Sequence, residues 1–213
     1  MKSNQENEKS LVDNSKSVFL KTWPGGYREN WNVYGKASGK REDDVVSQCL
    51  SPFYGIGKSA LEIGCGVGFW TEKYLSPNFK NVTALDLLPS VGFKAKNVKY
   101  IEVPDRDFSC YGVADSSIDF CWSFGVFCHL SINACAEYVS SIYSKLKPGG
   151  EVSLFFSNND RRQAGGEFDK DIVQWVKNNF QTTEIMLASA GFIQIRDLMP
   201  SLFDTMIYGK KPA

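Results

Sequence analysis

The residues best suited to chemistry begin with an acid and three glycines at the end of an apolar run. Ser59–Ile63 has the composition of a short buried strand. Glycines follow it at every second position, as Gly64, Gly66 and Gly68. Glycine has no Cβ, so the backbone can turn sharply and a ligand can approach it closely. The spacing differs from the G-x-G-x-x-G of dinucleotide sites, and the acid Glu62 suits a ligand with a positive amino group.

A second acid closes the next apolar run. Asp86 lies 22 residues after Gly64 and ends Asn81–Asp86, which is typical of a second short strand. In nucleotide-binding folds an acid at this place accepts hydrogen bonds from ribose hydroxyls. The alternative is an aspartate that caps the turn after its strand. Because the glycine turn lies upstream, the pattern favours the ribose role and predicts a nucleoside ligand.

The chain has one histidine, His129, which follows the apolar run Ile118–Ser123. Imidazole is the side chain whose ordinary pKa lies closest to neutrality, so it can accept a proton under physiological conditions. Parallel sheets bind ligands at the carboxyl ends of their strands. We therefore predict that His129 is a general base. The alternative is a loop histidine that hydrogen-bonds the backbone and orders the turn before Ser131.

Strand-like and helical patterns alternate through the rest of the chain. Beyond the first two strands, the expected strands are Val98–Val103, Ile118–Ser123, Glu151–Phe156, Ile193–Leu198 and Leu202–Tyr208. A helix capped by Ser131 is expected before the fifth strand. The polar stretch 157–168 is expected to be a substrate-side loop, and 169–180 a helix. Thr182 or Thr183 is expected to cap the helix that follows.

Several of these features occur in the order in which one enzyme family has them. The glycine turn with Glu62 resembles the E/D-x-G-x-G-x-G motif of the class I S-adenosylmethionine (SAM) dependent methyltransferases, and Asp86 matches the acid of their second strand. Ala114–Phe120, A-D-S-S-I-D-F, resembles the segment that leads into their fourth strand. Leu146–Gly150, L-K-P-G-G, resembles the turn before their fifth strand. The resemblance extends over about 58–210, and the four motifs together are specific where each alone is not.

The resemblance implies a fold and a reaction. The fold is α/β, a Rossmann-like three-layer sandwich of about seven strands, mostly parallel with an antiparallel last strand. The reaction is methyl transfer from SAM, with S-adenosylhomocysteine as the product. An acid after the third strand is implied to bind the adenine amino group. Asp105 and Asp107 both fit, and Asp107 is preferred because Phe108 adjoins it and can lie against the ring. The expected cofactor-binding residues are Glu62, Gly64, Gly66, Asp86, Asp107, Phe108 and Ser123, and the expected catalytic residue is His129.

The acceptor is expected to be a small molecule. Nucleic-acid base methyltransferases commonly have an N/D-P-P-Y/F run after the fourth strand, whereas this chain has S-F-G-V at 123–126. A hydroxyl of a sugar or polyol is the first choice, because an alcohol needs the base that His129 offers. The alternatives are a small-molecule N-methyltransferase and a SAM-binding protein without transferase activity.

The amino-acid composition argues against several classes of partner and cofactor. The 24 basic and 24 acidic side chains balance, which disfavours nucleic acid as a partner. No apolar run approaches the ~20 residues of a membrane span, and the first ten residues carry no signal core, so we expect a cytoplasmic protein. The six cysteines lack metal-ligand spacing, so we expect reduced, buried thiols and no metal cofactor. A monomer or a homodimer is expected.

Three segments are expected along the 213 residues. Residues 1–17 are polar and are predicted to be a disordered tail. Residues 18–57 are predicted to be a helical, aromatic segment that closes over the ligand or packs on the sheet. Its aromatic residues are Trp23, Tyr27, Trp31 and Tyr34. Residues 58–213 are predicted to be the SAM-binding methyltransferase domain.

Overall fold

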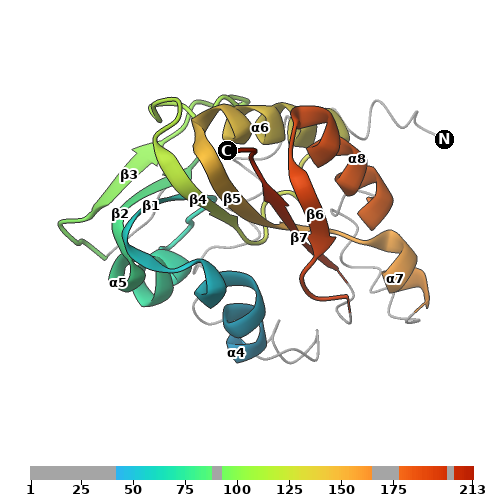
Figure 1. The fold of residues 1–213 in the computed structure, drawn as a ribbon, viewed down its shortest axis with the longest axis horizontal. Helices are drawn as coiled ribbons and strands as arrows, with labels where there is room; N and C mark the ends of the chain where they lie inside the picture. The colour runs from blue at the N-terminus through green and yellow to red at the C-terminus, as the bar shows by residue number, and fades with distance from the viewer. Residues whose placement is uncertain (1–41, 88–92, 165–177, 201–203) are drawn as a thin grey trace.

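The structure is a computed structural model that describes residues 42–87, 93–164, 178–200 and 204–213. Within these ranges one sheet has seven strands in the order β3-β2-β1-β4-β5-β7-β6 (Figure 1). The strands are β1 (Gly55–Ile63), β2 (Phe79–Asp86), β3 (Val98–Glu102), β4 (Ile118–Ser123), β5 (Leu146–Phe156), β6 (Ile193–Asp197) and β7 (Thr205–Lys210). The strands predicted from the sequence are all present, and β4 has the predicted bounds.

The pairing of the strands creates a switch point at β1. This strand pairs in parallel with β2 on one side and with β4 on the other, so the chain order reverses between β1 and β4. Ligands of open parallel sheets bind outside the carboxyl ends of the strands at such a point. At the other side of the sheet β7 is antiparallel to both β5 and β6. This confirms the predicted Rossmann-like sheet, mostly parallel with an antiparallel last strand.

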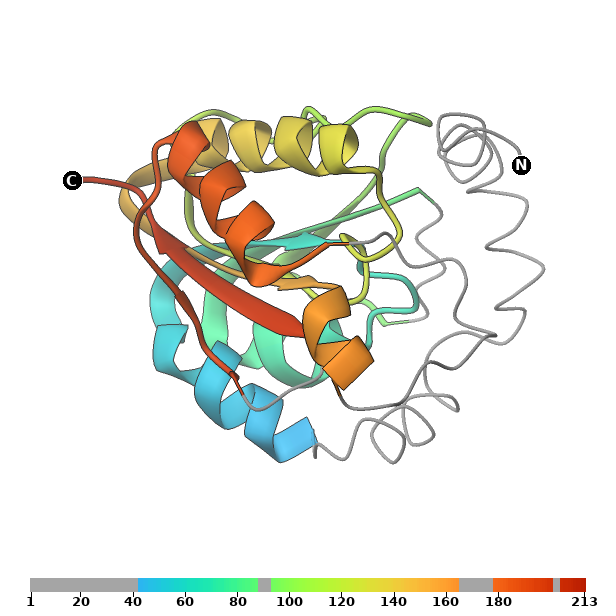
Figure 2. The ribbon, with the colours of Figure 1, turned by 90° about the vertical axis from the view of Figure 1, so that its right-hand side faces the viewer.

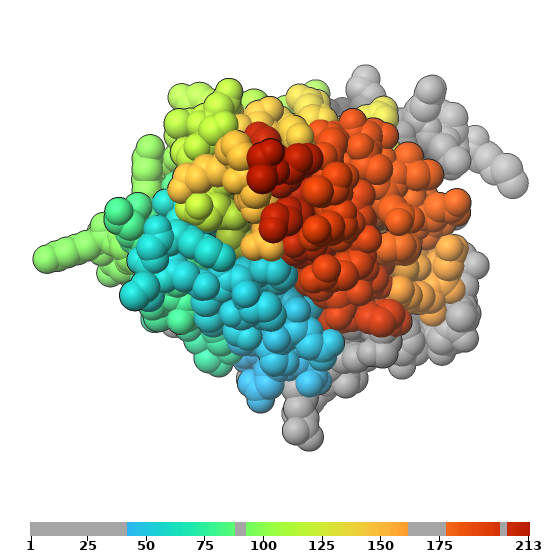
Figure 3. Space-filling view, viewed as in Figure 1, coloured from blue at the N-terminus to red at the C-terminus, as the bar shows by residue number. Residues whose placement is uncertain are grey.

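Helices cover both faces of the sheet, as the edge-on view in Figure 2 shows. One face carries α6 (Ile132–Lys145) and α8 (Phe180–Ala190). The other face carries α4 (Glu42–Val45) with the helical turns after it, and the helix at 69–78, which ends as α5 (Ser76–Asn78). In the space-filling view of Figure 3, the blue N-terminal helices and the red C-terminal strands adjoin on one side of the molecule. The described part is therefore a three-layer sandwich.

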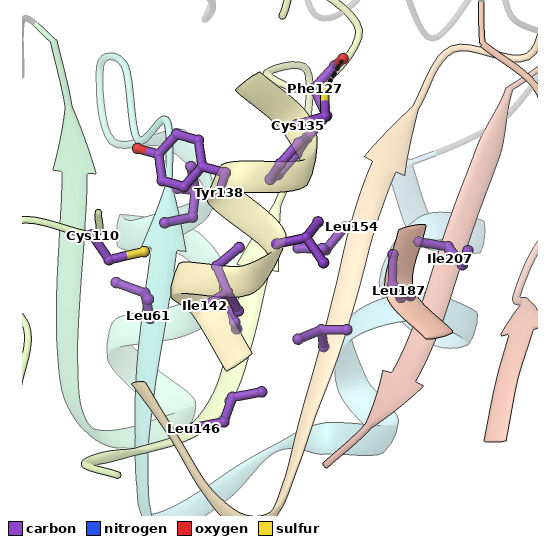
Figure 4. Close-up of a cluster of buried hydrophobic side chains, with 14 of the residues drawn as sticks. Leu61, Cys110, Phe127, Cys135, Tyr138, Ile142, Leu146, Leu154, Leu187 and Ile207 are labelled. Atoms are coloured by element: carbon purple, nitrogen blue, oxygen red, sulfur yellow. Dashed lines mark hydrogen bonds between the residues drawn. The ribbon is translucent and has the colours of Figure 1, made fainter. Parts of the chain in front are cut away.

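The larger core lies between the sheet and the helices α6 and α8. Figure 4 shows Ile142 and Tyr138 of α6 over Leu61 of β1, and Leu187 of α8 beside Ile207 of β7. The periodic apolar positions of α6 form this buried face, as the sequence pattern predicts. All six cysteines are free and buried, which agrees with the prediction that they are reduced, small core residues. No described helix is long and apolar enough to span a membrane.

Two helices differ from the sequence prediction, although the predicted cap of α6 is present. The amide of Ala134 donates to Ser131 Oγ at 3.3 Å, so Ser131 caps α6 as predicted. The cap of α8, however, is Asn179, whose Oδ1 accepts the amide of Thr182 at 2.8 Å. The prediction of Thr182 or Thr183 as the cap is therefore wrong, because the helix begins one turn earlier. The polar stretch predicted as a loop contains α7 (Asn159–Ala164).

The L-K-P-G-G segment differs from its prediction, and several predicted segments lie outside the described residues. The L-K-P-G-G segment was expected to form a turn before the fifth strand, but β5 already begins at Leu146, where Ile118 of β4 pairs with it. Much of the N-terminal part lies outside the described residues. This holds for the predicted tail 1–17 and for the aromatic residues of 18–41. Residues 169–177 of the helix predicted over 169–180 also lie outside the described residues, and its last residue, Phe180, begins α8. Of the segment 18–57, the structure describes 42–57.

Candidate active site

The glycine turn is fastened to the neighbouring strand. The amides of Gly64 and Cys65 both donate to the carbonyl of Leu85, at 2.7 and 3.0 Å. Gly64 has φ +76°, a left-handed conformation that is strained for any residue with a Cβ. A Cβ built on Gly64 would lie 2.0 Å from Cγ2 of Val126, which follows β4. Glycine is therefore required here both for the turn and for the close packing of the loop after β4.

Asp86 makes a direct contact with the same turn. Its Oδ2 accepts the amide of Gly66 at 2.7 Å, so the carboxylate that ends β2 lies against the turn that ends β1. Gly66 also has a positive φ, +52°, a backbone conformation that favours glycine. The structure thus brings together two residues that the sequence predicted as one nucleoside site. This arrangement fits a carboxylate that is held in place to accept hydrogen bonds from a ribose.

Glu62 is the buried acid beneath this turn. Its Oε2 accepts a hydrogen bond from the hydroxyl of Thr71, which is itself fully buried. Its Oε1 is buried and has no hydrogen-bond partner among the described residues. Burial raises the pKa of Glu62 to about 8; the bond from Thr71 opposes this shift, and the negative charge of Asp86 adds to it. A buried oxygen without a hydrogen-bond partner lowers the stability of the fold. A cationic donor at Oε1 would supply the missing hydrogen bond.

The residues predicted to hold adenine lie after β3. Oδ1 of Asp107 accepts the amide of Ser109 at 2.8 Å, which orders the turn, and Asp107 is partly buried. Asp105 is exposed. The ring of Phe108 packs on Tyr138 of α6 with centroids 5.5 Å apart. Asp107 is therefore the better placed of the two acids, and its role toward adenine stays a prediction.

In this structure Ser123 forms a hydrogen bond between two strands of the sheet. Its hydroxyl is buried and donates to the carbonyl of Ile63 at 2.9 Å, so it ties the end of β4 to the end of β1. Its predicted contact with the cofactor stays a prediction. The structure shows that Ser123 helps to fix the start of the loop that carries His129.

His129 belongs to the loop between β4 and α6. Its amide donates to the carbonyl of Val126 at 2.9 Å, and its side chain is partly buried. Because Val126 packs on Gly64, this loop is anchored on the glycine turn. His129 therefore follows, by three residues, the point at which the fourth strand's loop contacts the predicted cofactor turn. This position agrees with the base predicted from the sequence, and the catalytic role of His129 stays a prediction.

Aromatic rings gather where β4 and β5 end. Phe124 lies 4.6 Å from Phe155 and 5.3 Å from Trp70, measured between ring centroids. Phe69 and Phe124 are partly exposed, whereas Trp70 and Trp122 are buried. Sequence reasoning did not assign this cluster to the site. It forms an apolar wall on the side of the sheet that carries the helix at 69–78.

Comparison with known proteins defines the class. Residues 61–154 match the family model described as a methyltransferase domain. This match runs from the last residues of β1 to Leu154 of β5 and includes the glycine turn, Asp86 and His129. Together with the fold, it supports a class I SAM-dependent methyltransferase with SAM as its cofactor.

Individual relatives differ in the acceptor that their names give. The chain is 25% identical over 198 residues to the N-terminal Xaa-Pro-Lys N-methyltransferase 1 of Rattus norvegicus, covering 87% of this chain and 86% of the relative. It is 22% identical over 174 residues to the probable thiol methyltransferase 2 of Arabidopsis thaliana, covering 78% and 73%. The Burkholderia thailandensis 1,6-didemethyltoxoflavin-N1-methyltransferase with bound S-adenosylhomocysteine has the same fold. It superposes with a TM-score of 0.64 at 16% identity, covering 97% of this chain and 90% of that one.

The side chains at the glycine turn match the chemical groups of SAM. The unpartnered Oε1 of Glu62 suits the ammonium group of the cofactor's methionine part. Asp86 suits the ribose, and the glycine turn leaves room for a close approach. Within the ranges that the structure covers, no group of three or more His, Cys, Asp or Glu side chains could hold a metal ion.

The Gly64–Val126 contact yields a testable prediction about stability. Gly64→Ala is expected to lower the free energy of unfolding by about 2 to 3 kcal/mol, because it combines a left-handed backbone with a steric clash. The double variant Gly64→Ala/Val126→Ala should lose less than the sum of the two single variants, since removing the valine methyls removes the clash. Urea unfolding of the four proteins measures this coupling. Strict additivity of the two changes would show that the clash is absorbed elsewhere.

Proposed function

We propose that this methyltransferase transfers the methyl group of SAM to an amine nitrogen and that His129 takes up the acceptor's proton. The observation that carries the proposal is the loop after β4, which packs on the glycine turn through Val126 and presents His129 three residues later. When bound, SAM supplies a methyl group on a positively charged sulfur, which is already a good leaving group. What remains for the protein is to align the acceptor and to remove its proton.

The choice of nitrogen rests on the comparisons. The relative from Rattus norvegicus is named for methylating protein N-termini, and it aligns with this chain over most of both lengths. A free α-amine is protonated in part at neutral pH, so it becomes a nucleophile only after it loses a proton. A base beside the acceptor would therefore raise the rate with such a substrate.

A hydroxyl of a sugar or polyol is the second candidate. It is the acceptor that the sequence predicts, and His129 favours it because an alcohol depends on a positioned base even more than an amine does. The small-molecule substrate and the cytoplasmic location predicted from the sequence are part of this second proposal. The chemistry at His129 is the same in both cases, and the acceptor distinguishes them.

An acceptor panel with methyl-labelled SAM tests the proposal. The panel contains a peptide that begins Xaa-Pro-Lys with a free α-amine, the same peptide acetylated at its N-terminus and at its lysine side chain, a small amine, a polyol and a thiol. We expect label on the free-amine peptide or the small amine and none on the acetylated peptide. Label on the polyol alone would overturn the nitrogen proposal in favour of the hydroxyl. Label on the thiol alone would overturn both.

A further inference from the structure

Thr71 contacts Glu62 across the glycine turn. It begins the π-helical turn Thr71–Leu75 that follows the glycines, and it is fully buried. Its hydroxyl donates to Oε2 of Glu62, whereas Oε1 has no hydrogen-bond partner among the described residues. One oxygen of this buried carboxylate is therefore held by the protein and the other is spare. Buried polar atoms in native proteins are nearly always paired, so the spare oxygen points to a ligand.

We infer that Thr71 is a positioning residue of the cofactor site, whose hydroxyl fixes the carboxylate of Glu62 and keeps Oε1 for the ammonium group of SAM. The inference rests on SAM as the cofactor and is independent of the acceptor. A rotamer held by a buried hydrogen bond does not have to be ordered again when the ligand binds, which lowers the cost of binding. The π-helical turn agrees with this role, because such turns are frequent at functional sites.

Burial and a neighbouring negative charge favour the protonated form of Glu62 in the free protein, and a bound ammonium group favours its carboxylate form. Asp86 at the end of β2 adds a negative charge and raises the pKa of Glu62 further above the value that burial sets. Burial also raises the pKa of Cys65 in the turn, of Tyr100 on β3 to about 12 and of Cys121 on β4, so these three groups stay neutral near pH 7. With a pKa of about 8, Glu62 holds its proton at pH 6.5 in the free protein. An ammonium group beside it favours the carboxylate, so binding of SAM releases this proton.

The first test replaces the hydroxyl of Thr71 by a methyl group of similar size. Thr71→Val is expected to weaken the binding of SAM about tenfold, since a hydrogen bond to a carboxylate is worth about 1.5 kcal/mol or more. Thr71→Ser keeps the hydroxyl and is expected to bind within about threefold of the parent. S-adenosylhomocysteine carries the same amino group and should weaken by the same factor. Calorimetric titration of the full chain measures all of these affinities.

The second test measures the release of the Glu62 proton when SAM binds. In the parent, titration at pH 6.5 in buffers of different ionisation enthalpy is expected to show release of about one proton per SAM bound. This release should decline as the pH rises through about 8, because Glu62 then loses its proton before the ligand arrives. The bond from Thr71 lowers the pKa of Glu62, so the decline should move to higher pH in Thr71→Val and stay in place in Thr71→Ser.

Glu62→Gln supplies the control that separates positioning from folding. If Thr71 acts through Glu62, Thr71→Val should change SAM affinity by less than about twofold in the Glu62→Gln background. A tenfold loss in both backgrounds would mean that Thr71 only supports the fold, and the inference would be overturned. An unchanged pH profile in Thr71→Val would overturn it as well. A parent that binds no SAM would instead contradict the assignment of the cofactor itself.

Discussion

Replacing His129 by alanine is expected to leave the affinity for SAM within about twofold of the parent and to lower turnover roughly a hundredfold or more. The side chain follows the contact between Val126 and the glycine turn and is not part of that turn. The loop itself is held by backbone and core contacts, including the Sγ of Cys135, which donates to the carbonyls of Phe127 and Leu130 at 3.5 and 3.6 Å. Loss of the imidazole should therefore remove the proton acceptor without removing the cofactor site.

His129→Asn separates this role from a structural one. Asparagine can replace a hydrogen bond of the imidazole but cannot accept a proton at neutral pH. We expect the asparagine variant to be as slow as the alanine variant. The rate of the parent should fall as the pH drops below neutrality, because a protonated imidazole cannot take up the acceptor's proton. An asparagine variant with nearly the parental rate and a flat pH profile would leave His129 with a structural role.

The second large effect is expected on stability, at the far end of β5. The guanidinium of Arg161 in α7 bonds Oδ2 of Asp197 at 2.5 Å and the carbonyl of Asp204 at 3.1 Å. Oδ1 of Asp204 in turn accepts the amide of Asn158 at 3.1 Å, and Asn158 bonds Thr205 at 2.9 Å. The network joins α7 to the ends of β5, β6 and β7. It lies at the carboxyl end of β5, the strand that follows the helix after His129.

Arg161→Met is expected to lower the free energy of unfolding by about 3 kcal/mol. It leaves the mostly buried carboxylate of Asp197 without its cationic partner, and the amide of Met199 alone among the described residues still donates to Oδ1, at 3.0 Å. For a chain of this size the change corresponds to a fall of about 6 to 12 °C in the melting temperature. Thermal unfolding measures the change. Arg161→Met/Asp197→Asn removes both charges and should recover much of the loss. A double variant that is less stable than Arg161→Met would show that the charge left behind is not the cause.

The strands and the sites at strand ends could be predicted because local patterns determine them. The apolar run that predicts β4 at Ile118–Ser123 reflects burial on both faces, and the structure has the same bounds. Gly66 and Asp86 could be paired from the sequence, since parallel neighbours bring their carboxyl ends together. Ser131 could be identified as a cap from its position before a periodic helix.

Contacts between distant segments could not be predicted in this way. Val126 meets Gly64 across 62 residues, and only the pairing of β1 with β4 brings them together. Thr71 follows Glu62 by nine residues, but its contact depends on how the glycine turn folds back. α7 was missed because its residues are polar, and its order comes partly from Asn158, whose Oδ1 accepts the amide of Arg161 at 3.2 Å.

The most direct test of the central claim is a calorimetric titration of SAM into the parent chain and into Asp86→Ala, with Asp43→Ala as a matched control. Asp43 is an exposed acid of α4, outside the glycine turn. We expect the parent and the control to bind one SAM per chain with the same affinity and to show no binding of NAD. Asp86→Ala should bind SAM at least about tenfold more weakly, because it lacks the carboxylate that holds Gly66 and accepts from the ribose. Parental affinity in Asp86→Ala, or no binding of SAM to the parent, would contradict the account.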